Sequence, residues 1–179
     1  MNQEMIFAGF GGQGVMLMGQ ILAYAGMMEG QQVSWFPAYG PEMRGGTANC
    51  SVIIGDEVVG TPIVTEPKVI VAMNLPSLDK FEPLLAKDGI LLVNSSLIER
   101  AAHRTDVKIW RVPCNDIAKE LENPKVANMV MVGAIIAASG VVQVESVLQV
   151  LAKKIFKNKP EVMKLNEQAI RRGMGCINK

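Results

Sequence analysis

A glycine-rich turn near the N-terminus constrains the fold of this chain most strongly. The stretch MIFAGFGGQGV, residues 5–15, places a short apolar run before four glycines. Gly9, Gly11 and Gly14 fit the pattern G-x-G-x-x-G, in which glycines permit a tight strand-to-helix turn and close helix–strand packing. We therefore expect Gly14 to lie at a helix–strand contact and Gly11 or Gly12 to take positive φ.

Strand-like and helix-like segments alternate along the rest of the chain. Strands are predicted at 5–8, 33–36, 68–73, 90–93 and 107–112, and helices at 14–28, 77–85, from 115, and at 126–138, 144–156 and 161–173. Turn residues predict an irregular loop at 37–46 and an antiparallel hairpin around Gly55-Asp56. Asn115 and Asn128 are expected to cap their helices.

This alternation predicts an α/β fold. We expect one layered, Rossmann-like domain over residues 1–179, with a mainly parallel sheet, an antiparallel hairpin portion and C-terminal helices.

The glycine pattern leaves two functions open, a packing turn and a cradle for a phosphate-bearing cofactor. A nicotinamide site also needs an acidic residue after the second strand, which binds the ribose hydroxyls. The predicted second strand reads VSWF and is followed by Pro37, while the nearest acid, Glu29, precedes it. The sequence therefore favours a packing turn over a nicotinamide site.

Charge and hydropathy exclude several other classes of protein. The formal net charge of +1 predicts no broad attraction to nucleic acid. The longest apolar-rich run, 127–142, contains Asn128 and Ser139 and is too short for a membrane span of roughly 20 residues. The N-terminus lacks the basic region of a secretory signal, so we expect a cytoplasmic protein without membrane contact.

Few residues are suited to catalysis or to metal binding. Cys50, Cys114 and Cys176 lie far apart in the sequence and form no CxxC pair, so no self-contained zinc or iron–sulfur site is expected. They are interpreted as buried or unreactive thiols. The lone His103 lies in a polar stretch and is expected to be exposed. No catalytic residue and no metal ligand are predicted for this chain.

Two stretches together resemble a known family. GFGGQGV at 9–15 and YGPEMRGGTANCSV at 39–52 resemble the gamma subunit of 2-oxoacid:ferredoxin oxidoreductases, and NMVMVGA at 128–134 resembles a third landmark of that family. The resemblance covers nearly the whole chain in the same order. The length is similar to that of the gamma chains of 2-oxoglutarate and branched-chain (2-oxoisovalerate) enzymes, and the choice of 2-oxoacid stays open.

This resemblance implies a division of labour among subunits. The family oxidatively decarboxylates a 2-oxoacid to acyl-CoA and passes the electrons to ferredoxin. Thiamine diphosphate lies between alpha and beta subunits, and iron–sulfur clusters belong to a delta or other chain. The gamma chain supports assembly and the coenzyme A region, and it is not expected to be active alone.

The resemblance also suggests which residues of this chain carry its role. The turn has free backbone N–H groups that can accept an anion at the helix start, and Arg44 has donors for a carboxylate or phosphate. Tyr39, Glu42 and Arg44 would lie on the loop that faces the catalytic subunits, or they hold their own loop in shape. The candidate cofactor-binding residues are Gly9, Gly11, Gly12, Gln13, Gly14 and Arg44.

Other functions compatible with the sequence are kept as alternatives. They are a gamma-like subunit of an indolepyruvate oxidoreductase, an independent nucleotide-binding α/β enzyme, and an assembly module without a small ligand.

Overall fold

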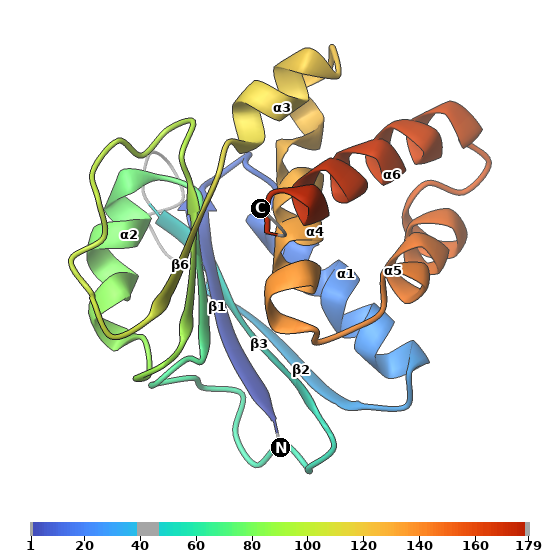
Figure 1. Cartoon of the computed structure of the whole chain (residues 1–179). Coiled ribbons are helices and arrows are strands. Elements are labelled where there is room, and N and C mark those ends of the chain that lie inside the picture. Colours follow the sequence, from blue (N-terminus) through green and yellow to red (C-terminus); the bar gives the residue numbers. More distant parts are fainter. Residues whose placement is uncertain (1, 39–46, 178–179) are drawn as a thin grey trace.

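Six strands form one twisted sheet in a computed structural model that describes residues 2–38 and 47–177 (Figure 1). The order across the sheet is β2-β3-β1-β4-β5-β6. The strands are β1 (Gln3–Phe10), β2 (Gln32–Ala38), β3 (Thr47–Gly55), β4 (Val69–Ala72), β5 (Ile90–Asn94) and β6 (Lys108–Val112). Strands β1, β4, β5 and β6 pair in parallel, whereas β3 is antiparallel to both β1 and β2. The mainly parallel sheet with an antiparallel portion is confirmed.

The antiparallel portion is not the hairpin predicted at Gly55-Asp56. Residues 56–68 form no strand, and β3 pairs with β2 on one side and with β1 on the other. Both edges of β3 are therefore occupied, so the segment that follows has no free edge to join. Pro62 and Pro67 also disfavour a ladder there, because proline lacks an N–H donor.

Helices cover both faces of the sheet. Figure 1 shows α2 (Leu75–Phe81) on one face of the sheet and four helices on the opposite face, with α3 (Cys114–Glu120) beyond one end of the sheet. The four helices are α1 (Val15–Met28), α4 (Ala127–Ser139), α5 (Val144–Val150) and α6 (Pro160–Gly175). Short 3₁₀ turns occur at Glu82–Leu84 and Pro124–Val126, and a π-helical turn, Leu151–Ile155, extends α5. The predicted C-terminal helices are thus present.

Each face of the sheet has its own hydrophobic core. The larger core joins the sheet to α1, α3, α4, α5 and α6, and the smaller one joins β1, β4 and β5 to α2. Within the described residues, no helix has the length and apolar character needed to cross a membrane.

Helix α4 is fixed unusually tightly in the larger core. Its first ten residues, 127–136, are all buried. A Cβ on Gly133 would lie 1.9 Å from the carbonyl oxygen of Ile170 in α6, and one on Gly173 would lie 1.8 Å from that of Val130. The two helix backbones therefore touch directly, which holds the N-terminal end of α4 in a defined place beside the glycine turn.

Candidate functional site

The glycine turn lies where the sheet changes its winding direction. From β1 the chain passes through α1 to β2 at one edge of the sheet, and from β4 it passes through α2 on the opposite face to β5. The point between the carboxyl ends of β1 and β4 is therefore a topological switch point, where open α/β sheets bind their ligands. The turn at residues 11–14 follows β1 at this point, and Met73 follows β4.

The glycines of the turn have two separate reasons to be glycine. Gly12 and Gly14 have φ of +93° and +75°, a region that other residues rarely adopt, so the predicted positive φ in the turn is confirmed. A Cβ on Gly14 would lie 2.3 Å from Nδ2 of Asn128. The expected helix–strand contact of Gly14 is therefore wrong, because Gly14 contacts helix α4. Gly9 makes the close contact with the sheet, since its Cβ would lie 2.9 Å from that of Met73.

Gln13 ties the turn to the ends of the strands. Its Oε1 accepts a hydrogen bond from the backbone N–H of Phe10 at 2.6 Å, and its Nε2 donates to the carbonyl oxygen of Met73 at 3.3 Å. Both polar atoms of the side chain are thus engaged. In this arrangement Gln13 shapes the turn rather than offering a group to a ligand.

Two hollows flank the glycine turn and share Gly12 and Gly14. The smaller, of about 280 Å³, is lined by Phe10 and Ala48 and by the first turn of α1, residues 15–17. Among the described residues, no side chain caps α1, which leaves its first backbone N–H groups for solvent or a ligand. This hollow is where the predicted anion site at the helix start would lie.

The larger hollow, which we call the asparagine cavity, has a volume of about 390 Å³. It opens on the other side of the turn, against the starts of α3 and α4. Its lining residues are Gly12, Gln13, Gly14, Met73, Asn115, Pro124, Lys125, Ala127 and Asn128.

The two asparagines of this cavity were predicted to cap their helices, but they do not. Helix α3 begins at Cys114 with Pro113 before it, and α4 begins at Ala127 with Val126 before it, so both asparagines lie inside the first turn. Their side chains face the cavity instead. The sequence analysis missed Asn115 and Lys125 as candidate site residues and gave Asn128 a different role.

Tyr39, Glu42 and Arg44 lie outside the described residues, so their predicted contacts with catalytic subunits or a ligand stay predictions.

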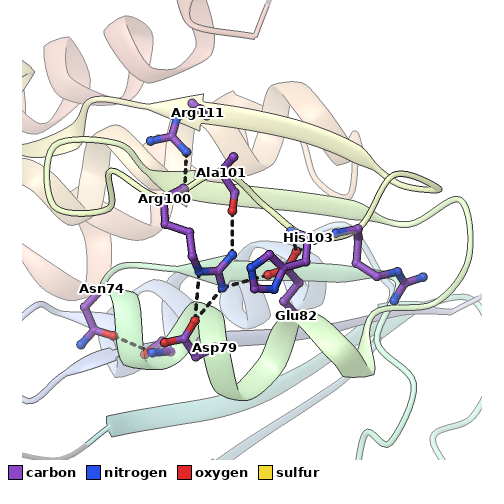
Figure 2. Close-up of polar contacts among 9 residues, drawn as sticks. Asn74, Asp79, Glu82, Arg100, Ala101, His103 and Arg111 are labelled. Atoms are coloured by element: carbon purple, nitrogen blue, oxygen red, sulfur yellow. Dashed lines mark hydrogen bonds and ion pairs between the residues drawn. The ribbon is translucent and has the colours of Figure 1, made fainter.

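A second polar cluster, which we call the Glu82 cluster, lies between α2 and the loop before β6 (Figure 2). Oε1 of Glu82 accepts the backbone N–H groups of His103 and of Arg104, the latter at 2.9 Å. Its Oε2 binds the guanidinium of Arg100 at 3.0 Å, and Arg100 also binds Asp79 at 2.6 Å. The side chain of His103 is exposed, as predicted.

The electrostatics of Glu82 fit a structural role. Burial opposes its ionisation, but the N–H of Arg104, the Arg100 guanidinium and the N–H of His103 together hold the pKa of the carboxyl below its usual value. The carboxylate is thus buried, ionised and hydrogen-bonded at both oxygens. It fastens the 95–106 loop to α2.

Two of the three cysteines are buried thiols. Cys50 and Cys114 are buried, and Cys176 is half-buried. Burial raises the pKa of Cys50 to about 12, and burial also raises the pKa of Cys114. Among the described residues, no three His, Cys, Asp or Glu side chains are grouped so that they could hold a metal ion.

The sheet order also disfavours a nicotinamide site. In a dinucleotide-binding fold the second strand lies beside the first and presents its acid to the ribose. Here β3 separates β1 from β2, which places β2 roughly 10 Å from β1 at the usual strand spacing. The missing acid and the displaced strand both disfavour a nicotinamide site.

Comparison with known proteins places the chain in a family. Residues 4–176 match the family described as pyruvate ferredoxin/flavodoxin oxidoreductase, and the chain belongs to that family. The resemblance to gamma subunits of 2-oxoacid:ferredoxin oxidoreductases, noted from the motifs, is thereby confirmed. The fold is confirmed by the gamma subunit of a keto/oxoacid ferredoxin oxidoreductase from Geobacter sulfurreducens, which has a TM-score of 0.84, is 30% identical, and is matched over 98% of both chains.

Two curated relatives carry different substrate names. A ketoisovalerate oxidoreductase subunit, VorA, of Methanothermobacter thermautotrophicus is 40% identical over 93% of this chain and 34% of its own length. A 2-oxoglutarate synthase subunit, KorC, of Methanocaldococcus jannaschii is 32% identical over 90% of this chain and 88% of its own length. This chain therefore spans about a third of the VorA relative and most of the KorC relative.

Proposed function

We propose that the chain is the gamma subunit of a cytoplasmic 2-oxoacid:ferredoxin oxidoreductase, which converts ketoisovalerate or 2-oxoglutarate to its acyl-CoA. Its partners are alpha, beta and delta subunits, which supply thiamine diphosphate and iron–sulfur clusters, and ferredoxin takes the electrons from the complex. The match to a gamma subunit over 98% of both chains is the observation that carries this proposal.

The residues of the site are suited to binding a ligand rather than to catalysis. The described residues at the switch point offer hydrogen-bond donors and one cation, Lys125, but no carboxylate, imidazole or thiol lines either hollow. Such a site can bind and orient an anionic ligand, and it lacks the groups for general acid–base or covalent catalysis.

Coenzyme A is the anionic substrate of the proposed reaction and is therefore the ligand that we expect at this site. Its phosphates suit the uncapped start of α1, where the backbone N–H groups of residues 15–17 border the smaller hollow. We propose that this turn and Arg44 contact coenzyme A, while the acyl transfer takes place on the partner chains.

Reconstitution tests the proposed function. The chain is produced alone and together with candidate alpha, beta and delta chains encoded beside its gene, and 2-oxoacid-dependent reduction of an artificial electron acceptor is measured with coenzyme A present. We expect turnover only from the complex that includes this chain, and the better substrate of ketoisovalerate, 2-oxoglutarate and pyruvate identifies the enzyme.

Two results would contradict the proposal. One is turnover by the isolated chain supplied with cofactors, because that would make it an independent enzyme. The other is micromolar binding of NAD or NADP in a calorimetric titration. Within an active complex, Arg44→Ala is expected to raise the KM for coenzyme A or to weaken assembly.

A further inference from the structure

Strand β2 is an edge of the sheet that has little protection against a further chain. It pairs with β3 on one side and with no other strand among the described residues (Figure 1). Exposed edges are normally shielded by charged side chains, by proline or by a covering segment. β2 reads QVSWFPA, so it has no charged residue, and Pro37 blunts only one end of it. This edge is therefore suited to contact with another protein chain.

An apolar groove lies beside this edge, between β2 and α1. The α1–β2 groove has a volume of about 240 Å³, and its lining residues are Gln20, Ala23, Tyr24, Met27, Val33 and Trp35. None of these described residues is charged, and Met27 and Tyr24 are 57% and 38% exposed. Tyrosine, tryptophan and methionine are enriched at the cores of protein–protein interfaces, where charged residues are depleted. The composition of the groove therefore indicates a docking surface.

Lysines are concentrated in the turn that lies next to the groove. The π-helical turn and the segment after it contain Lys153, Lys154, Lys157 and Lys159, all exposed, which we call the lysine turn. The ammonium group of Lys154 lies 4.6 Å from the centre of the Tyr24 ring, so the lysine turn adjoins the groove. Within the described residues, no acidic side chain forms an ion pair with any of the four lysines.

The acid at the end of α1 does not neutralise these lysines. Oε1 of Glu29 accepts a hydrogen bond from the backbone N–H of Gln143 at 2.7 Å. The groove and the lysine turn together thus present an apolar centre with positive charge at its border. A partner with carboxylates around an apolar side chain is complementary to such a surface, since opposite charges speed the encounter and the apolar contact supplies affinity.

Charge disfavours a second copy of this chain as the occupant. If two β2 edges paired antiparallel about a two-fold axis, the helices of both copies would lie on the same face of the joined sheet. The two lysine turns would then lie near each other, because each adjoins the groove that borders β2. Like charges across that contact oppose association. The surface therefore favours a partner with acidic side chains.

We propose that the α1–β2 groove and the lysine turn form one docking surface for a partner subunit of the oxidoreductase, which places an apolar side chain in the groove and carboxylates against the lysines. The apolar and acidic chemistry of the partner follows from this surface. Its assignment as a subunit of the complex rests on the proposed function.

Binding of the chain to its partner chains tests the lysine turn. The immobilised alpha, beta and delta chains are titrated with this chain at low and at high salt. The double variant Lys153→Glu/Lys154→Glu should bind at least about tenfold more weakly than the wild type at low salt, and the difference should shrink as salt rises. Lys108→Glu reverses an exposed charge on β6, at the opposite edge of the sheet, and should change the affinity less than about twofold.

A charge placed in the groove tests the apolar contact. Met27→Glu should weaken binding by about tenfold or more, because it puts a carboxylate where an apolar side chain of the partner is buried. Leu97→Glu is the matched control, since Leu97 is 47% exposed and does not line the groove. Melting curves of the isolated variants establish that each is folded.

The outcomes separate this proposal from the proposed function. Wild-type affinity in both Met27→Glu and the lysine double variant, within an active complex, overturns the docking surface and leaves the proposed function intact. Losses of equal size in the controls overturn the docking surface as well. A wild-type chain that binds none of the partner chains contradicts the proposed function and, with it, the assignment of the partner.

Two further results would assign the surface to another occupant. Light scattering that shows a dimer of the isolated wild-type chain, dissociated by Met27→Glu, would identify a second copy. Sedimentation of the chain with phosphatidylglycerol vesicles, abolished in the lysine double variant, would identify a membrane surface. Either result overturns the proposal of an acidic partner subunit.

Discussion

The asparagine cavity, of about 390 Å³, and the hollow beside the Glu82 cluster, of about 380 Å³, have nearly equal volumes. The two regions differ in whether their polar side chains are hydrogen-bonded within the protein. Glu82 accepts three hydrogen bonds from Arg100, His103 and Arg104, and Arg100 and Arg104 find further carboxylate and carbonyl partners. In the asparagine cavity, Asn128 has no hydrogen-bond partner among the described residues.

This difference separates a structural network from a binding site. A buried network whose groups are paired with one another stabilises the fold, whereas donors on a cavity wall that have no protein partner can bind a ligand. Charge alone would have selected the Glu82 cluster as the functional site, because it holds more ionisable groups. The hydrogen-bond state selects the asparagine cavity.

The largest effect on stability is expected for a substitution of Gly14, which lines the asparagine cavity. Gly14→Val should lower the free energy of unfolding by about 2 to 4 kcal/mol, because a β-branched side chain at φ +75° would be strained and would collide with Asn128. Gly12→Ala is the matched control, because Gly12 also has positive φ but a Cβ added there would meet no neighbouring atom. This variant should lose only about 1 kcal/mol of its free energy of unfolding. Urea unfolding of both variants measures the difference. Equal losses would show that the contact with α4 is unimportant.

Removal of the buried carboxylate should be the next largest effect. Glu82→Ala should destabilise the chain by about 2 to 3 kcal/mol, because it leaves the backbone N–H groups of His103 and Arg104 without their acceptor and removes one of the ion pairs of Arg100. The affinity for inorganic pyrophosphate, a probe for the phosphates of coenzyme A, should stay unchanged. The control is Glu167→Ala, which breaks an exposed pair with Arg171 and should cost at most about 0.5 kcal/mol. A loss of pyrophosphate binding in Glu82→Ala would remove the contrast between the two clusters.

The Glu82 cluster should also be sensitive to acid. Because the folded pKa of Glu82 is lowered, its contribution to stability is complete above the ordinary carboxyl pKa of about 4.3 and is lost as the pH falls through the folded value. The stability difference between the wild type and Glu82→Gln should therefore shrink on acidification. Chemical unfolding at a series of pH values checks this, and a constant difference would mean that the carboxylate gains nothing from its partners.

The smallest effect on stability is expected at the unpaired amide. Asn128→Ala should leave stability unchanged or raise it by up to about 1 kcal/mol, since it breaks no hydrogen bond among the described residues and alanine favours helix. The same change should weaken pyrophosphate binding. Asn94→Ala is the contrasting variant, because it breaks three hydrogen bonds of a fully buried side chain and should clearly destabilise. A marked loss of stability in Asn128→Ala would indicate that Asn128 is structural.

The sequence predicted the layers of this fold better than its strand pairing. Periodicity and the glycine turn located β1 and α1, because a buried strand, a tight turn and a helix leave strong local patterns. The partner of β3 was missed, since the apolar run after Gly55 resembles a strand and only the tertiary contacts of β3 with β1 and β2 show that no edge is free.

Only the glycine turn of the candidate site was predicted from the sequence. The glycines of the turn are read from spacing, but Asn115, Lys125 and Asn128 reach the same cavity from more than 100 residues further along the chain. One signal was present, because Asn94 and Asn115 come at or just after the ends of predicted strands, where parallel sheets gather their polar groups. The hydrogen bond from Asn94 to Asn115 is tertiary and has no sequence signature.

The central claim, that unused donors mark the binding site, is tested most directly by NMR titration of the ¹⁵N-labelled chain with inorganic pyrophosphate. We predict that the side-chain NH₂ resonances of Asn115 and Asn128 shift in a saturable manner, while the Nε–H resonance of Arg100 in the Glu82 cluster stays in place. Saturable shifts of Arg100 with unchanged Asn115 and Asn128 resonances would contradict the account.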